Sequence, residues 1–175
     1  CAPAGGVWST ADRGESPGPL GAHDLASIGV SDISSHPTDP DRIWLATGDG
    51  DFGDTRSIGV LTSADGGQSW AETGLDWSPH MGRTLTRIIV HPEHPDTLLA
   101  ASSLGIYRTT NGGATWIRTL TGDMASLECD PSDPDHWLAG AFGNTVAESH
   151  DAGASWSTQY LDGSSFGISR IALAF

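Results

Sequence analysis

Ser63-Ala64-Asp65-Gly66-Gly67-Gln68-Ser69-Trp70 decides the fold of this chain of 175 residues, because the stretch is repeated. Two further copies, which we call boxes with the first, are Thr109-Thr110-Asn111-Gly112-Gly113-Ala114-Thr115-Trp116 and Ser149-His150-Asp151-Ala152-Gly153-Ala154-Ser155-Trp156; a degenerate copy without the Trp surrounds Asp12. The equivalent positions Asp12, Asp65, Asn111 and Asp151 are 53, 46 and 40 residues apart. Internal repeats at this spacing are typical of propellers and other repeat proteins.

A second signature precedes each full box. It covers 36–41 (His-Pro-Thr-Asp-Pro-Asp), 91–96 (His-Pro-Glu-His-Pro-Asp) and 130–135 (Asp-Pro-Ser-Asp-Pro-Asp). Pro fixes φ and Asp accepts hydrogen bonds from nearby backbone N–H groups, so this signature predicts a turn. We assign the same turn role to His91, Glu93 and His94, although they resemble metal ligands at first sight.

Each repeat contains four short runs that read as strands. The predicted first strands are 31–35, 87–90 and 126–129, the second 43–47, 97–101 and 136–140, the third 58–62, 105–108 and 145–148, and the fourth begins at the Trp of each box. A four-stranded repeat of this length is a propeller blade. The sequence therefore predicts an all-β propeller, with blades over 27–80, 81–121 and 122–165, the end of a blade over 1–26 and the first strand of another over 166–175.

Two architectures fit this division. The chain is either a piece of a larger propeller, which we favour, or a closed four-bladed ring in which the strand at 166–175 completes the blade at 1–26. Closure would remove exposed strand edges, whereas a piece would offer them to further blades or to another chain.

Composition excludes several classes of protein. The chain has 23 Gly and 10 Pro, which favours turns over helices, and 22 acidic residues against 8 basic ones, all Arg, for a net charge of −14. Such a charge repels phosphate backbones and anionic lipid, so we expect no nucleic-acid partner. No apolar run approaches the roughly 20 residues of a membrane span. Cys1 and Cys129 form one disulfide or none.

The boxes themselves predict a structural role. We expect each Asp or Asn side chain to accept hydrogen bonds from backbone N–H groups two residues further on, and the following Gly to provide the positive φ of a tight hairpin. The aromatic residues Trp70, Trp116 and Trp156 are expected to bury an apolar face between blades.

The pattern Ser/Thr-x-Asp/Asn-x-Gly-x-Ser/Thr-Trp resembles the Asp-box, or bacterial neuraminidase repeat, of sialidases, xyloglucan-active glycosidases and sortilin-type ectodomains. The stretch 27–116, with Ala46-Thr47-Gly48-Asp49-Gly50-Asp51, most resembles the large secreted glycosyl-hydrolase-like propellers of environmental bacteria. The resemblance implies a secreted or cell-surface protein whose ligands bind on the face away from the boxes. It predicts recognition of a glycan or a protein surface; the alternatives are part of a glycoside hydrolase, or a pure assembly module.

One set of candidate ligand-binding residues shares a single repeat position near the start of the first strands. It consists of Asp32, Arg87, Ser126 and Arg170. The two arginines are candidates to grip a substrate carboxylate, as three do in sialidases, or else to pair with neighbouring acids. The third sialidase-type arginine has no counterpart here, and neither Tyr107 nor Tyr160 lies where a nucleophile would be needed.

Two loops add further candidates on the same face. An insertion unique to one blade carries Asp49, Asp51 and Asp54, which predict either a Ca²⁺ site or a solvated acidic loop. A longer connection carries Trp77 with Arg83, read as an exposed ring that stacks on a sugar or as a packing residue between blades. Nothing in the spacing resembles a nucleophilic triad, a phosphate loop or a zinc site.

Overall fold

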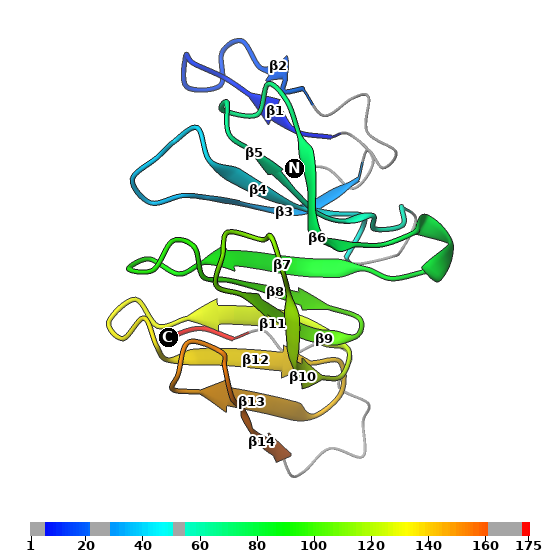
Figure 1. The fold of residues 1–175 in the computed structure, drawn as a ribbon, viewed down its shortest axis with the longest axis vertical. Helices are drawn as coiled ribbons and strands as arrows, with labels where there is room; N and C mark the ends of the chain where they lie inside the picture. Colours follow the sequence, from blue (N-terminus) through cyan, green and yellow to red (C-terminus); the bar gives the residue numbers. More distant parts are fainter. Residues whose placement is uncertain (1–5, 22–28, 51–54, 161–172) are drawn as a thin grey trace.

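The computed structural model describes residues 6–21, 29–50, 55–160 and 173–175, and in this part the regular structure is almost entirely β (Figure 1). The first full sheet contains β3 (Val30–Ser35), β4 (Ile43–Thr47), β5 (Gly59–Ser63) and β6 (Ala71–Asp76). The second contains β7 (Leu85–Val90), β8 (Leu98–Ser102), β9 (Gly105–Thr109) and β10 (Ile117–Thr121). The third contains β11 (Met124–Cys129), β12 (Trp137–Ala141), β13 (Thr145–Ser149) and β14 (Ser157–Tyr160).

A two-stranded sheet of β1 (Trp8–Ser9) and β2 (Gly18–Pro19) precedes them, and the 3₁₀ helix η2 (Pro79–Met81) lies between the first two full sheets in the chain. All strand pairs are antiparallel, and neighbouring strands in the chain are neighbours in the sheet. This is the meander of a propeller blade, so the predicted all-β propeller fold is confirmed. In the described part of the chain no helix has the length and apolar character needed to cross a lipid bilayer.

The hydrophobic core lies between successive sheets. The second strands carry much of it, and all five residues of β8 are buried, because another sheet covers each face. One cluster joins Trp44 of the first full sheet to Leu85 of the second, and another joins Leu99 of the second to Trp137 of the third. The outermost strands are mostly exposed, and all of β14 is.

The sheets follow one another in a row, with β1 and β2 at one end and β11–β14 at the other (Figure 1). At the C-terminal end, the ring of Phe175 contacts that of His136, the residue directly before β12, with ring centroids 4.9 Å apart. The described residues form an open stack, as in a partial propeller. Most of the strand expected at 166–175, which would complete a closed four-bladed ring, lies outside the described residues.

The first strands share one irregularity. The pairing between first and second strands shifts register after Val30, after Leu85 and after Met124. As a result Asp32, Arg87 and Ser126 occupy equivalent register positions, opposite Ala46, Ala101 and Gly140. The common repeat position expected for these three residues is confirmed; the fourth, Arg170, lies outside the described residues.

Each box is a hairpin closed by the same side-chain network. In the first box the Ser63 hydroxyl accepts hydrogen bonds from the N–H groups of Asp65 (3.2 Å) and Gly67 (2.8 Å). The Asp65 carboxylate accepts the N–H of Ser69 at 2.9 Å, four residues on and not two as expected. The N–H of Gly67, two residues after Asp65, donates to the Ser63 hydroxyl instead.

The boxes also contact the turns and the preceding sheet. The N–H of Gly66 donates to the carbonyl of Asp41 at 3.0 Å, so the box and the turn lie at the same end of the sheet. Across the sheets, Nε1 of Trp44 donates to the carbonyl of Gly112 (3.0 Å), and Nε of Arg108 donates to that of Ala152 (2.8 Å). Each of these two boxes thereby docks on the sheet before it in the chain.

The 36–41, 91–96 and 130–135 segments are turns. Nδ1 of His91 accepts the N–H groups of Glu93 (3.2 Å) and His94 (3.1 Å). In the third turn Asp130 replaces the imidazole and accepts the N–H of Ser132 at 2.7 Å. The turn role predicted for His91 is thus confirmed.

Candidate functional site: the inner-strand groove

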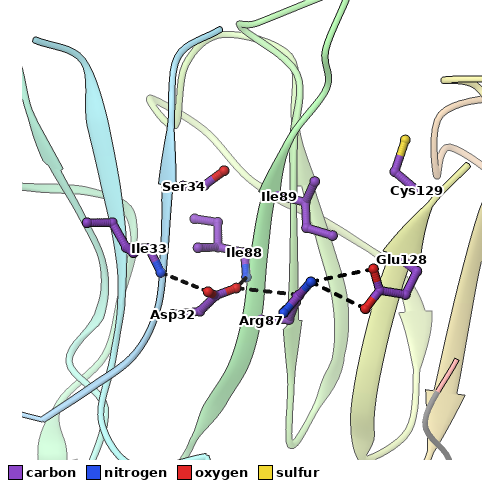
Figure 2. Close-up of a pocket in the computed structure, with 8 residues that line it drawn as sticks. All are labelled: Asp32, Ile33, Ser34, Arg87, Ile88, Ile89, Glu128 and Cys129. Atoms are coloured by element: carbon purple, nitrogen blue, oxygen red, sulfur yellow. Dashed lines mark hydrogen bonds and ion pairs between the residues drawn. The ribbon is translucent and has the colours of Figure 1, made fainter. Parts of the chain in front are cut away.

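The first strands of the three full sheets border an open depression of about 320 Å³, which we call the inner-strand groove (Figure 2). Strand β3 provides Asp32, Ile33 and Ser34, β7 provides Arg87, Ile88 and Ile89, and β11 provides Glu128 and Cys129. The groove is therefore built by three repeats and not by a single loop.

An ionic row crosses the groove, with Arg87 in the middle (Figure 2). Its Nη2 donates to both carboxylate oxygens of Glu128, at 3.3 and 3.4 Å. Its Nε is buried, has no hydrogen-bond partner in the described part of the chain, and lies 3.6 Å from Oδ2 of Asp32. We call Asp32, Arg87 and Glu128 the ionic row.

Side chains of β3 also hold the neighbouring strand β7. The carboxylate of Asp32 accepts the N–H groups of Ile33 and Ile88, both at 2.9 Å, and the hydroxyl of Ser34 accepts the N–H of Val90 at 3.1 Å. The bonds from Ile88 and Val90 connect the two sheets through side chains of β3, and they satisfy backbone N–H groups at the edge of β7. Asp32 is consequently fixed in position.

The row remains open to solvent. The side chains of Asp32, Arg87 and Glu128 are 21%, 43% and 32% exposed. Two carboxylates facing one guanidinium leave the row with a net negative charge. Of the two roles considered for Arg87, the structure shows pairing with neighbouring acids. A substrate carboxylate bound at Arg87 would be repelled by the two carboxylates beside it.

Cys129 closes one end of the groove as a free thiol. Burial, followed by the nearby carboxylate of Asp130, raises the pKa of this thiol to about 11. Because the thiolate is the nucleophilic form, this raised pKa disfavours a nucleophilic role for Cys129 at neutral pH.

Trp77 does not lie on a ligand-accessible surface. Its side chain is 4% exposed and packs in the core between the first two full sheets, edge-on to Tyr107. The guanidinium of Arg83 covers its ring at 5.5 Å. Of the two roles considered for Trp77, packing between blades is the one that the structure supports, and a ring buried in this way is not available to stack on a sugar.

The predicted calcium loop lies mainly outside the described residues, which include Asp49 but not Asp51 or Asp54. Asp49 is 5% exposed, and its N–H donates to the carbonyl of Thr55 at 2.8 Å. The Ca²⁺ site stays a prediction.

The sequence reasoning missed Glu128. It lies two residues after Ser126 on β11, so aligning repeats at one position did not select it. Side chains two residues apart on a strand share a face, and this would have placed Glu128 beside the shared register position.

Comparisons with known proteins agree with the fold. No protein-family profile matches the chain. A probable oligoxyloglucan-reducing end-specific xyloglucanase from Neosartorya fischeri is 27% identical over 71% of this chain and 14% of its own length. A xyloglucanase from Paenibacillus sp. is 32% identical over 58% of this chain and 11% of its own length. The chain thus spans a small part of the curated relatives it matches.

Solved structures show the same architecture. An ancestral GH74 enzyme superposes with a TM-score of 0.72 at 19% identity, over 93% of this chain and 22% of that one. The GH74 xyloglucanase from Xanthomonas campestris gives 0.66 at 21% identity, over 89% and 27%. YCF48 bound to D1 peptide gives 0.60 at 19% identity, over 89% and 49%. The chain is a propeller segment related to glycoside hydrolases.

Proposed function

We propose that this segment recognises a neutral polysaccharide of the xyloglucan class in the inner-strand groove. The observation that carries the proposal is the ionic row, which lies partly exposed across three repeats. The names of the two sequence relatives, both xyloglucanases, support the substrate class. Because a polysaccharide does not cross a membrane, we place the protein outside the cell.

The chemistry of the groove suits sugar hydroxyl groups. Carboxylates accept hydrogen bonds from hydroxyls, and a guanidinium donates to them. Ile33, which is 38% exposed, adds an apolar surface for the C–H face of a pyranose ring. The net negative charge of the row favours neutral sugars over sialic or uronic acids.

A second candidate is a contribution to hydrolysis. A glycosidase needs two carboxyl groups on either side of the scissile bond, and Asp32 and Glu128 both line the groove. Both, however, face the same guanidinium, and Asp32 accepts two backbone N–H groups. We therefore favour recognition here, with any catalytic carboxylates contributed by other parts of the protein.

Titration of the chain with a xyloglucan oligosaccharide, followed by NMR, tests the proposal. We expect shifts in the amides of β3, β7 and β11, and an affinity reduced by roughly 10-fold or more in Arg87→Ala, because a hydrogen bond to a charged group is lost. Arg118→Ala, which changes an exposed arginine on β10, is the matched control and leaves binding unchanged.

Two outcomes would redirect the assignment. Equal binding by Arg87→Ala and the parent chain would remove the groove from the proposal. Release of reducing ends by the parent chain, abolished in Glu128→Gln, would favour the hydrolytic candidate.

We also assign the repeats to the Asp-box type, which is supported by the hydroxyl–carboxylate network of the hairpins.

For Asp49, Asp51 and Asp54 we propose Ca²⁺ binding, because their side chains offer oxygen ligands and Gly residues lie between them. A rise in melting temperature on adding CaCl₂, reversed by a chelator and lost in Asp51→Asn, is the expected result.

A further inference from the structure

Three potential metal ligands meet at the box end of the third full sheet. One ring nitrogen of His136, a carboxylate oxygen of Glu148 and one ring nitrogen of His150 all lie within 4.8 Å of one another. Oε1 of Glu148 is 2.9 Å from Nε2 of His136 and 3.4 Å from Nε2 of His150. Two imidazole nitrogens therefore converge on one carboxylate oxygen.

The hairpin of β12 and β13 creates this convergence. Trp137 pairs with Ser149 and Leu138 with Glu148, so His136 and His150 flank the end of the ladder on opposite strands. Their rings stack with centroids 4.4 Å apart and an interplanar angle of 16°. The backbone register thus brings the two rings together, although the residues are 14 positions apart in the sequence.

A further carboxylate orients the inner imidazole. Oδ2 of Asp130 lies 3.4 Å from Nδ1 of His136, on the side of the ring opposite Glu148. Asp130 is itself held by the hydroxyl and the N–H of Ser132, both at 2.7 Å. Metal-binding histidines usually donate their second ring nitrogen to such a carboxylate, which fixes the ring.

The other two blades show that the fold does not need these residues. The positions equivalent to His136, Glu148 and His150 are Arg42, Thr62 and Ala64 in the first full sheet and Thr97, Arg108 and Thr110 in the second. Both sheets build the same turn and the same box with these side chains. The donor set is therefore an addition to the third blade.

We propose that His136, Glu148 and His150 bind a divalent cation of the Zn²⁺ class, with Asp130 as a positioning residue. Two imidazoles and one carboxylate are typical Zn²⁺ ligands, whereas Ca²⁺ takes oxygen ligands alone. The side chain of His150 is 66% exposed, so the cation has a path from solvent and keeps at least one coordination position for water. The site links the 130–135 turn to the third box. The spacing of the sequence indicated no zinc site, and the hairpin register supplies one.

Zinc titration of the untagged chain, in competition with a chromophoric chelator, tests the site. We expect one Zn²⁺ per chain, with NMR shifts in the imidazole signals of His136 and His150. The variant His136→Thr/His150→Thr introduces the residue types that the second blade carries at these positions, and it loses the bound ion. Asp130→Asn weakens binding by roughly 10- to 100-fold, as outer-sphere substitutions do.

Controls separate loss of a ligand from loss of the fold. His80→Thr changes an exposed histidine in η2 and leaves zinc binding unchanged. With EDTA present, His150→Thr unfolds at the same urea concentration as the parent. Absence of bound Zn²⁺ in the parent, or undiminished binding in either His150 variant, overturns the proposal.

Discussion

The box face and the inner-strand groove use the same repeats in opposite ways. On the box face, Ser63, Thr109 and Ser149 each accept the N–H of a glycine four residues on, at 2.8–3.1 Å. In the groove, one register position holds Asp32, Arg87 and Ser126, which are acidic, basic and neutral. Positions that carry the same type of side chain in every repeat maintain the fold. Positions that share only their place in the strand register, and differ in side chain, are available for function.

The largest expected loss of stability on the box face comes from replacing a glycine of a box by alanine. Gly153→Ala places a Cβ onto Cδ2 of buried Leu99 in a residue with φ of 76°. We expect a loss of roughly 3 kcal/mol in the free energy of unfolding, from backbone strain and overpacking together. Gly82→Ala, where φ is 65° and the nearest atom to the new Cβ is Nη1 of Arg56 at an ordinary contact distance of 3.6 Å, isolates the backbone strain. Equal losses in the two variants, measured by urea unfolding, would contradict the packing contribution.

Removing a box hydroxyl gives the next largest effect. Ser149 is buried and accepts the N–H of Gly153 at 2.9 Å, so Ser149→Ala leaves that donor without a partner. The expected cost is about 1–3 kcal/mol. Ser157→Ala removes an exposed hydroxyl and should stay within about 0.5 kcal/mol. A Ser149→Ala variant as stable as Ser157→Ala would show that the box network contributes little.

Low pH should distinguish the box that carries Asp65 from the box that carries Asn111, because only the Asp can be protonated. Hydrogen bonds from the Ser69 hydroxyl, the Ser69 N–H and the Ser63 hydroxyl lower the pKa of Asp65 from its usual 3.8 to about 2. The pKa is lower in the folded state, so this stabilisation is complete above about pH 4 and is lost as the pH falls toward 2. The second box carries Asn111, which does not titrate. Asp65→Asn should therefore flatten the fall of the urea midpoint over this range, and an unchanged slope would contradict the role of Asp65.

The smallest stability effect is expected in the groove. Arg87 is partly exposed, and ion pairs in such settings contribute about 0–1 kcal/mol. Arg87→Gln should therefore change the free energy of unfolding by less than about 1 kcal/mol. A loss above 2 kcal/mol, measured in urea, would place Arg87 among the residues that maintain the fold and weaken the proposed role of the ionic row.

The sequence predicted the features that depend on neighbouring residues, and it missed contacts between residues on different sheets. The boxes, the turns and most strands follow from neighbouring residues, so Asp65 and its equivalents could be assigned directly. Arg87 and Glu128 are on different sheets, and no spacing along the chain reveals that they meet. The burial of Trp77 depends on how its connection folds over the core, which loop length does not specify.

The docking of the boxes gives the stack a direction. The box with Gly112 receives Trp44 of the sheet before it, and the box with Ala152 receives Arg108 of the sheet before it. A chain synthesised from its N-terminus can therefore complete one interface each time a further repeat emerges, before the rest of the chain is made. Growth of such a propeller by gene duplication would proceed in the same direction. A blade added at the C-terminal end carries a box whose carbonyl groups accept hydrogen bonds from the blade already there.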